Sequence, residues 1–447
     1  MITLLEIAYR NLLQARRRTL LLGSAIALVA CLFLVLRAVS ASISERMIES
    51  ATTLSAGHVN VGGFFKTRRK AANPILAQRD EIRRITRELV PEAVSIIDRH
   101  RGWGRLISPA SSINIGINGI VPEEEQRFFQ SLRLAAESEY KKDGSEQRLG
   151  RFADLAQPNT AILFAAQAKK LEVQVGDSLT FVTEASGGQS NTVDLRIVAI
   201  ASDIGFMSNW SIFVPRQTVL DLYKVGPDTT GVVMVYLASP AQAEAVMARL
   251  REGFPKKGFA VLDHDPNPFF FKFDKIAGED WLGQKLDLTI WSDEISFVLW
   301  ITKTLDMLAF FVIAVLATII VGGLMNSMWM SVRERTKEIG TMRAIGAPKS
   351  FVINMFVLEA LLLGFLSSAI GLFIGGSLLS LLNKLQLPIS NDGIRLFLMA
   401  NTLAFSLHIS QFVLTLLLFT AVTGLAALYP ALKAARMRPV EALMQSK

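Results

Sequence analysis

Apolar residues gather into four long runs along the chain, and each run is long enough to cross a membrane as a helix. A bilayer core of about 30 Å is spanned by about 20 helical residues. The first run is uncharged from Leu20 to Leu36. We therefore predict an α-helical membrane protein with four transmembrane helices, at residues 19–41, 304–330, 351–382 and 412–432.

The segment before the first run, residues 1–18, places apolar and polar residues on opposite sides of a helix. Its apolar side consists of Ile2, Leu5, Ala8, Tyr9, Leu12 and Leu13, facing away from Glu6, Arg10 and Asn11. This pattern predicts an amphipathic helix lying on the inner face of the membrane. The alternative is that the segment merely extends the first transmembrane helix.

A large segment of ordinary globular composition, residues 42–296, separates the first two runs. Its apolar positions alternate between strand and helix spacing, which predicts an α+β domain. We expect two subdomains, the inner one at residues 122–228, and helical stalks at residues 42–54 and 281–303. The expected strands are residues 57–61, 112–121, 178–182, 193–200, 211–214 and 231–237. The expected helices are residues 74–90, 123–137, 160–171, 217–225 and 241–253.

The net charge of +8 is distributed unevenly between these segments. Residues 1–18, 331–351 and 432–447 carry 13 Lys and Arg against 4 Asp and Glu, whereas residues 42–296 carry 30 against 32. Lys and Arg in short segments are retained in the cytoplasm, so the positive charge indicates topology rather than a nucleic-acid surface.

This charge distribution predicts a multi-pass protein of the bacterial inner membrane. Both termini and the loop at residues 331–350 are expected in the cytoplasm, including the tail at residues 433–447. The domain at residues 42–296 and the short loop at residues 383–411 are expected in the periplasm. The basic triplet before the first run also resembles a signal peptide, but that run is longer than a usual signal core.

The residue patterns of common catalytic and metal sites are absent from the sequence. No GxxxxGK[ST] phosphate loop occurs, and the four histidines lack the spacing of a metal site. The single cysteine, Cys31, excludes thiolate clusters and lies within the first apolar run. We therefore expect a chain that is not an enzyme and binds neither a metal nor a cofactor.

The basic loop at residues 331–350 has the design of a short helix rather than of a linker. Val332, Ile339, Met342 and Ile345 form an apolar side. Gly346 can supply a left-handed C-terminal cap, and the following Pro348 prevents continuation of the helix. A docking element for a cytoplasmic partner would need this design.

Polar and small residues inside the third run require a separate interpretation. Glu359 lies about two turns into the run, where carboxylates are paired or functional. We expect a structural hydrogen bond; proton coupling and an interaction near the inner surface are the alternatives. Ser367, Gly371 and Gly375 form a small-residue face, which permits close helix contact within the chain or in a dimer.

Two motifs and the order of segments resemble a known family. The loop VRERTKEIGTMRAIGA and the ending YPALKAARMRPVEAL are similar to the two signatures of FtsX-like ABC permeases, the MacB, LolC/LolE and FtsX group of the type VII, mechanotransmission class. The segment from Ala165 to Pro215, which contains VGDSLTF, resembles the MacB-like periplasmic core domain. One span, a large outer domain and three further spans are also the plan of this family.

The resemblance assigns a role to the loop between the second and third spans. In this family that loop is the coupling helix that contacts a separate ATPase. The positions here that match the motif are Arg333, Glu334, Arg335, Glu338, Ile339, Gly340, Arg343, Ala344 and Gly346. Ile339 and Ile345 are expected to anchor the helix in a groove of the ATPase, between charged contacts.

The resemblance also implies a function and a set of partners. The chain is expected to be a permease subunit that couples ATP hydrolysis by a partner to movement of its periplasmic domain, for release of lipoproteins or lipids or for export of periplasmic substrates. The alternative is an FtsX-like regulator that activates a periplasmic partner such as a cell-wall hydrolase. ATP and Mg²⁺ would be bound by a cytoplasmic ATPase dimer. Further expected partners are a second permease chain, identical or paralogous, membrane lipids, and a periplasmic adaptor, a lipoprotein or an outer-membrane channel.

Overall fold

The computed structural model describes residues 2–14, 16–68, 71–184, 189–387, 389 and 405–437. The chain forms two compact units. We call the first the helical unit; its described residues lie within 2–43, 302–389 and 405–437. The second, residues 44–301, is the α+β domain. The expected tail at residues 433–447 lies outside the described residues from position 438, as does most of the expected loop at residues 383–411.

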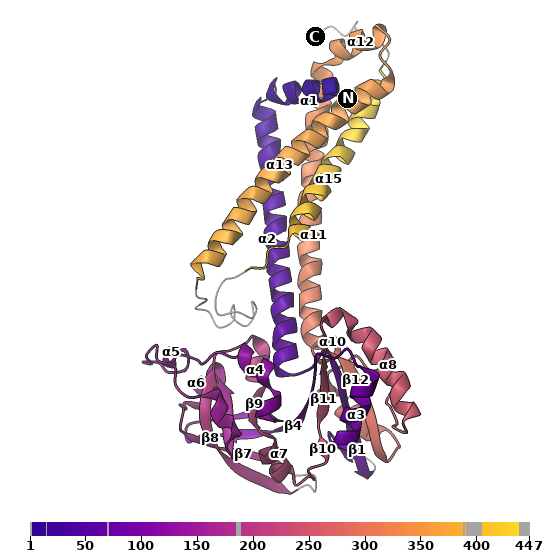
Figure 1. The fold of residues 1–447 in the computed structure, drawn as a ribbon. Helices are drawn as coiled ribbons and strands as arrows, with labels where there is room; N and C mark the ends of the chain where they lie inside the picture. The colour runs from indigo at the N-terminus through magenta and orange to yellow at the C-terminus, as the bar shows by residue number, and fades with distance from the viewer. Residues whose placement is uncertain are drawn as a thin grey trace. The chain divides into compact units, whose positions relative to one another are not determined.

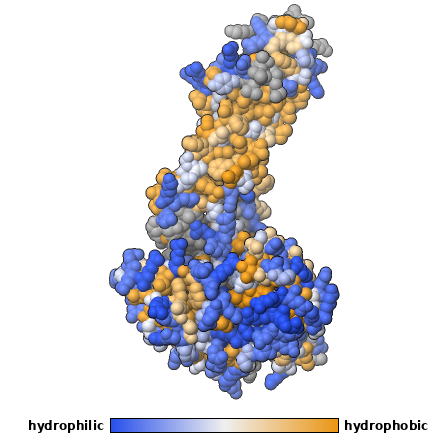
Figure 2. Space-filling model, viewed as in Figure 1, coloured by the Kyte–Doolittle hydropathy of each residue, from blue (hydrophilic) through white to orange (hydrophobic). Residues whose placement is uncertain are grey.

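Four helices in the described part of the chain are long and apolar enough to cross a membrane. They are α2 (Arg16–Leu54), α11 (Ser296–Glu334), α13 (Lys349–Leu385) and α15 (Ile409–Ala435). Their outer surface in the helical unit is largely apolar, whereas polar residues dominate the visible face of the α+β domain (Figures 1 and 2). The predicted fold class, four membrane helices with a large α+β domain between the first two, is confirmed.

The N-terminal segment forms a helix of its own, α1 (Ile2–Gln14), and α2 begins at Arg16. Ala8 and Leu12 are buried, while Tyr9 and Leu13 are exposed. The buried side of α1 lies against α13. The segment is therefore a separate amphipathic helix and does not continue the first span.

Small residues set the distance between α13 and α2. A Cβ atom added to Gly371 would overlap the carbonyl oxygen of Ala27, and one added to Gly375 would lie 3.2 Å from the sulfur of Cys31. A Cβ atom added to Gly23 of α2 would in turn lie 2.9 Å from the Ser367 hydroxyl oxygen. The predicted small-residue face of α13 therefore contacts α2 within the chain.

The other side of α13 packs against α15. Gly364 of α13 has no room for a side chain, because an added Cβ atom would overlap the hydroxyl of Thr423. Phe419 of α15 also reaches α2, where its ring meets Phe33 edge to face at a centroid distance of 6.0 Å. Close packing of backbones, rather than large side chains, thus holds α13 between its neighbours.

The α+β domain is organised by one sheet, with the strand order β12-β1-β11-β4-β5-β9-β6-β8-β7, and β2 paired to β1. The bounds are β1 Val59–Arg68, β2 Ala71–Asn73, β4 Ser95–Ile107, β5 Ser112–Ile120, β6 Thr160–Phe164, β7 Ser178–Glu184, β8 Ser190–Ala201, β9 Ser211–Pro215, β11 Val232–Tyr236 and β12 Gly283–Ile290. Two short strands, β3 (Leu76–Ala77) and β10 (Thr229–Thr230), form a second sheet.

The second half of the large sheet closes into a ring. Residues Arg105–Ile107 of β4 pair with Thr180–Val182 of β7, so the strands β4, β5, β9, β6, β8 and β7 form a closed set. The pairs β5–β9 and β6–β8 are parallel, and the other pairs of the ring are antiparallel. Leu106, Ile117 and Phe181 belong to the core of this half, which α6 (Ala165–Leu171) and α7 (Arg216–Tyr223) complete.

The first half of the sheet is open, and helices cover it. Strands β12, β1, β11 and the start of β4 form a common core with α3 (Arg79–Leu89) and α8 (Ala243–Lys256). The ring and the open half share β4, whose residues 95–99 pair with β11 and whose residues 100–107 pair with β5. The expected inner subdomain at residues 122–228 takes in most of the ring, but β4 and β5 come before it.

Several local expectations are wrong. β4 was not expected at all, because its sequence SIIDRHRGWGRLI places four ionisable residues in a row. Residues 281–303 were expected to be a helical stalk, yet β12 occupies Gly283–Ile290, and α11 begins only at Ser296. Residues 160–171 begin with strand β6 before α6. Residues 123–137 hold the end of a 3-10 turn (Pro122–Glu124), the short helix α4 (Gln126–Ser131) and the start of α5 (Glu137–Tyr140).

Two glycines of membrane helices provide a matched test of this packing. Gly371→Ala should force α13 away from the Ala27 carbonyl and cost about 1–3 kcal/mol of stability. Gly322→Ala of α11 has nothing within 4 Å of the new methyl group, and should be neutral or stabilising by up to about 1 kcal/mol. Thermal unfolding of the purified chain, followed by tryptophan fluorescence, measures both. Equal melting temperatures for the two variants would contradict the packing described.

Candidate functional site: a coupling helix and a charged strand

The predicted docking loop is a separate helix set off from α11 by a single residue. α11 ends at Glu334, and Arg335 leaves helical geometry with φ −103° and ψ 15°. The next helix, α12, runs Thr336–Ala344. Backbone hydrogen bonds continue through the break, from Arg335 to Ser331 and from Ile339 to Arg335. The chain therefore bends at Arg335 without losing its backbone hydrogen bonds.

The C-terminal end of α12 is closed by a glycine cap. Gly346 has φ +102° and donates to the carbonyl of Arg343 at 3.2 Å, and Ala347 donates to the carbonyl of Met342 at 3.0 Å. This pair of bonds is a Schellman motif, which requires a left-handed residue. Pro348 then precedes the first residue of α13. The predicted glycine cap and proline stop are both present.

The two sides of α12 differ from the expectation in one important residue. Ile339 and Gly340 are buried, and Ile339 belongs to the core of the helical unit together with Val332. Ile345 is 83% exposed. The expectation that Ile339 reaches into a partner is wrong, because its side chain already serves the fold; Ile345 is the apolar residue available to a partner.

The other motif residues divide between surface and support. Arg343 is half-buried, and its guanidinium donates to the Ala347 carbonyl at 2.9 Å, so it supports the capped turn. Arg335 is also half-buried. The exposed members of the motif are Arg333, Glu334, Glu338, Ala344 and Gly346, joined by Lys337 outside it. They give the surface a mixture of charges.

The carboxylate of Glu359 is contacted by polar side chains from several helices of the helical unit. This carboxylate lies 3.6 Å from the guanidinium of Arg335 and 4.0 Å from that of Arg18, and it accepts a hydrogen bond of 3.4 Å from the Asn11 amide. Arg18 also approaches Glu334 at 3.6 Å. The structure thus joins α1, α2, the bend before α12 and α13 around one buried carboxylate. A hydrogen bond was expected here; the two arginines were not.

A second concentration of charge lies in the α+β domain, on strand β4. Asp98, Arg99, His100 and Arg101 follow one another and are all buried. Buried charges require partners, because their removal from water is otherwise very costly. Each of these side chains is accordingly held by elements distant in the sequence.

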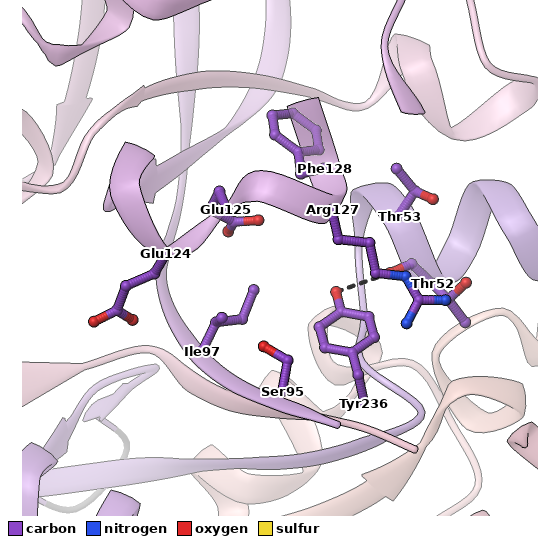
Figure 3. A pocket seen from close by; sticks show the side chains of 9 residues that line it. All are labelled: Thr52, Thr53, Ser95, Ile97, Glu124, Glu125, Arg127, Phe128 and Tyr236. Carbon is purple, nitrogen blue, oxygen red and sulfur yellow. Dashed lines mark hydrogen bonds between the residues drawn. The ribbon is translucent and has the colours of Figure 1, made fainter. Parts of the chain in front are cut away.

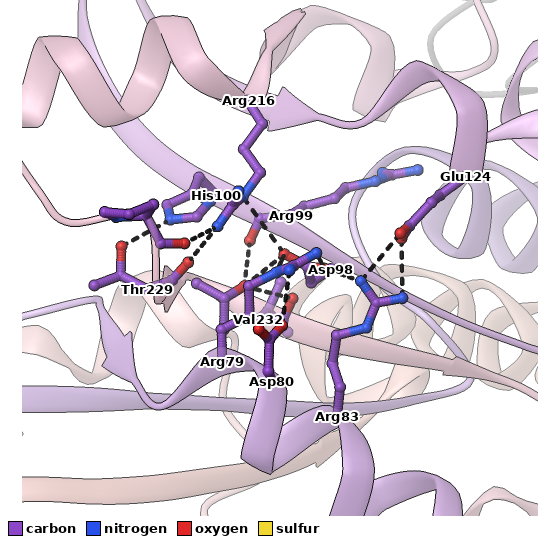
Figure 4. A network of polar contacts seen from close by, with 12 residues as sticks. Arg79, Asp80, Arg83, Asp98, Arg99, His100, Glu124, Arg216, Thr229 and Val232 are labelled. Carbon is purple, nitrogen blue, oxygen red and sulfur yellow. Dashed lines mark hydrogen bonds and ion pairs between the residues drawn. The ribbon is translucent and has the colours of Figure 1, made fainter.

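Asp98 is surrounded by three arginines (Figure 4). Arg79 binds its carboxylate with two hydrogen bonds of 2.7 and 2.9 Å, Arg83 with one of 2.6 Å, and Arg216 lies at 3.8 Å. Burial alone would raise the pKa of Asp98, but the hydrogen bond from Arg79 and the three positive charges outweigh it and lower the pKa. The same cluster fixes the starts of α3 and α7 to β4.

Arg99 holds the C-terminal end of α2. Its guanidinium donates to the carbonyls of Thr53 and Leu54, the latter at 2.9 Å, and forms a two-point ion pair with Glu125 at 2.5 and 2.8 Å. The hydroxyl of Tyr236 on β11 donates to the Thr52 carbonyl at 2.9 Å (Figure 3). Positive charge at a helix C-terminus is favourable, and these side chains satisfy carbonyls that the helix leaves open.

The aromatic run at residues 269–273 serves two purposes. Phe269 is buried, and its ring stacks on that of Phe64 at a centroid distance of 4.7 Å, so it is part of a core. Phe270 and Phe271 are 43% and 62% exposed, and with Trp103 they line a groove of about 1200 Å³ in the α+β domain. One part of the run is therefore core, and another part is exposed in the groove.

Among the described residues, no three His, Cys, Asp or Glu side chains are grouped to hold a metal ion. His264, which lies between two aspartates in sequence, instead forms a hydrogen bond of 3.0 Å with Asp293.

Comparison with known proteins defines the class to which this architecture belongs. Residues 19–252 match the model of the MacB-like periplasmic core domain, and residues 310–439 match that of the FtsX-like permease C-terminal domain. A helical membrane unit with an inserted α+β domain and both matches defines an ABC transporter permease. The chain belongs to the MacB/FtsX-like permease family.

Parts of the chain are also similar to individual relatives and to solved structures. The macrolide export ATP-binding/permease protein MacB of Acinetobacter baylyi is 31% identical over 36% of this chain and 22% of its own length. An uncharacterized ABC transporter permease of Methanocaldococcus jannaschii is 30% identical over 32% of this chain and 34% of its own. The chain thus spans between a fifth and about a third of these relatives.

A solved structure of the periplasmic region of MacB from Actinobacillus actinomycetemcomitans is 16% identical, with a TM-score of 0.28, and covers 46% of this chain and 88% of its own. The extracellular domain of the transporter YknZ from Gram-positive bacteria is 12% identical, also with a TM-score of 0.28, over 44% of this chain and 95% of its own.

The buried histidine of β4 generates a test of the charged strand. Burial, and then the charge of Arg216, lower the pKa of His100 to about 4, below the unfolded value of 6.5. The unfolded chain therefore binds more protons between pH 6.5 and pH 4, and stability should fall as pH falls through this window and stay level above it. In His100→Gln, the decrease in unfolding free energy between pH 6.5 and pH 4 should be smaller than in wild type by up to about 3 kcal/mol.

The measurement is thermal unfolding of wild type and His100→Gln between pH 7.5 and pH 4.5. The pKa of His58 is also lowered, by burial and then by Arg127, so some slope should remain in the variant. An unchanged slope would show that His100 does not titrate as its surroundings require.

Proposed function

We propose that the chain is the permease subunit of an ABC transporter whose ATPase is a separate chain, and that α12 is its coupling helix. One observation carries this proposal. α12 is a capped helix between two membrane spans, fixed to the helical unit by Ile339 and by the Arg335–Glu359 pair, while charged residues and Ile345 face away. A helix that is held by its buried side, and whose other side is exposed among the described residues, suits docking.

The orientation proposed from the charge distribution agrees with this role. α12 and both termini would lie in the cytoplasm, where ATP is available, and the α+β domain would lie in the periplasm. ATP and Mg²⁺ would bind to an ATPase dimer, and a second permease chain, identical or paralogous, would complete the transporter. This chain itself would perform no catalysis.

The proposed mechanism is mechanical. Movement of the ATPase would act first on α12 and then on α11, which directly precedes α12 in the chain. Because α11 begins in the α+β domain, the movement would reach that domain. The substrate would be a lipoprotein, a lipid or another compound already in the periplasm, and an adaptor or an outer-membrane channel would receive it. Membrane lipids would surround the four spans.

A second candidate function uses the same coupling differently. In an FtsX-like regulator, movement of the periplasmic domain would activate a partner such as a cell-wall hydrolase. The groove lined by Phe270, Phe271 and Trp103 would suit a substrate or a protein partner, because exposed apolar surface marks both kinds of binding region. Isolation of the ATPase complex, with identification of the periplasmic component, separates the two.

Topology is tested by single cysteines in a Cys31→Ala background. Ser178, exposed on β7, and Ser350, exposed at the start of α13, accept Ser→Cys with little change in size. A membrane-impermeant maleimide added to intact cells with a permeabilised outer membrane should label Cys at position 178 and not at position 350. Lysis should make both reactive. The reverse pattern would refute the orientation and the coupling mechanism with it.

The two isoleucines of the coupling region make a matched pair. Ile345→Ala should weaken ATPase binding about tenfold or more, because an exposed apolar residue at the centre of an interface carries much of its energy, and should leave the melting temperature unchanged. Ile339→Ala should instead destabilise the permease by about 2–5 kcal/mol through a core cavity. Glu338→Lys, which changes an exposed charge, should resemble Ile345→Ala.

The measurements are co-purification of the ATPase from membranes, its stimulated ATP hydrolysis, and thermal unfolding of the permease alone. Normal ATPase binding in both Ile345→Ala and Glu338→Lys would show that the outward side of α12 is not the docking surface.

A further inference from the structure

The end of α2 carries a second arginine contact besides Arg99. Arg101, two residues further along β4, donates to the carbonyl of Ser55 at 2.7 Å. The same guanidinium lies 3.7 Å from the carboxylate of Glu294 and 5.6 Å from the centre of the Phe269 ring. Arg101 and Glu294 are both buried. One side chain therefore touches the segment that ends α2 and a carboxylate from a distant part of the chain.

Glu294 is placed at the start of the other long helix. It is the last residue of α10 (Trp291–Glu294), and α11 begins two residues later, at Ser296. Its carboxylate also accepts hydrogen bonds from the Thr289 hydroxyl at 2.8 Å and from the Phe269 amide at 3.4 Å. The carboxylate is thus fixed to β12 and to the aromatic run before it meets Arg101.

From this geometry we infer that Arg101 is a positioning residue that ties the end of α2 to the start of α11 inside the α+β domain. The inference rests on the proposed function, in which α11 receives movement directly from α12. Arg101 then passes a displacement at the start of α11 to the end of α2.

The two arginines of β4 connect the end of α2 to different parts of the domain. Arg99 joins the Thr53 and Leu54 carbonyls to Glu125, which precedes α4 on the side of the ring. Arg101 joins the Ser55 carbonyl to Glu294, on the side of α11. Arg99 therefore connects the end of α2 to the segment before α4, and Arg101 connects it to the segment before α11.

Arginine is the residue type that this position requires. A planar guanidinium presents several donors in fixed directions, so that one side chain can serve a carbonyl and a carboxylate together. Lysine is a point charge on a flexible stem and would favour one of the two. Arg101→Lys should therefore keep the charge, and so most of the stability, but lose the bridge.

A competing connection exists within the helical unit, where the Ser40 hydroxyl of α2 donates to the carboxylate of Asp306 on α11. Movement could reach α2 through this contact instead. The two routes are distinguished by removing each contact separately and following the far end of α2.

The experiment uses the full permease with its ATPase in lipid nanodiscs, and measures hydrogen–deuterium exchange with and without trapped ATP. In wild type, ATP should change exchange in peptides covering residues 289–297 and residues 52–58. In Arg101→Met and Arg101→Lys the change at 289–297 should remain, and the change at 52–58 should fall at least threefold. Glu294→Gln keeps the size of the side chain and should give the same result. It is the second test in case an arginine variant folds poorly.

Arg84→Met is the matched control, because Arg84 of the same domain forms an exposed ion pair with Glu81. It should leave both differences intact, as should Ser40→Ala. The double variant Arg101→Met/Glu294→Gln should lose no more of the ATP-dependent difference than either single variant, since both remove one bridge.

Three results would overturn the inference. Exchange that rises equally with and without ATP, with the difference preserved, would show that Arg101 only stabilises the fold. Loss of the difference at residues 52–58 in Ser40→Ala but not in Arg101→Met would assign the route to the helical unit. A wild-type complex that shows no ATP-dependent difference anywhere in the permease would refute the proposed function, and the inference with it.

Discussion

The burial of four ionisable side chains in succession on β4 is the constraint around which the α+β domain is arranged. Each of them must replace its water by a partner, and the partners come from six places: the start of α3, the start of α7, the segment before α4, the end of α2, the end of α10 and, for His100, β10. Removing these partners would leave buried polar or charged groups of β4 unsatisfied, which is costly.

Because β4 also pairs with both the open half and the ring, this requirement fixes the two halves to one strand.

Glu359 imposes a similar requirement in the helical unit. A carboxylate inside a membrane helix must be paired, and here the partners are drawn from α1, α2 and the bend before α12. The bend at Arg335 brings this side chain toward Glu359, and burial of Ile339 in the same core holds the following helix. Contacts inside the helical unit therefore fix the position of α12. The exposed residues of α12 are not part of that core.

The sequence was sufficient wherever one local rule decided the outcome. Apolar run length predicted the four spans, and the Gly346–Pro348 pair predicted the cap of α12, since only a left-handed residue can close a Schellman motif. β4 was missed because a run of charged residues argues against a buried strand unless its partners are known, and those partners are up to 193 positions away at Glu294. β12 was missed because it lies only a few residues before the apolar start of α11.

The candidate site shows the same division between local and distant information. The motif identified the right segment, but helical spacing alone placed Ile339 and Ile345 on one apolar side. Only the neighbours of α12 reveal that the first is enclosed and the second is exposed. The signal available in the sequence was the intramembrane Glu359, which requires a partner, but the sequence did not show that Arg18 and Arg335 supply it.

Buried ion pairs of this kind are explained better by geometry than by stability. Buried ion pairs in general recover little more than their own desolvation cost, and apolar pairs of the same volume often hold a fold as well. An apolar pair, however, is non-directional, and it would tolerate sliding of the end of α2 against β4. Guanidinium contacts to the Thr53, Leu54 and Ser55 carbonyls fix one register of that helix end. Under the proposed mechanism, in which the helices move the domain, that fixed register would matter more than additional stability.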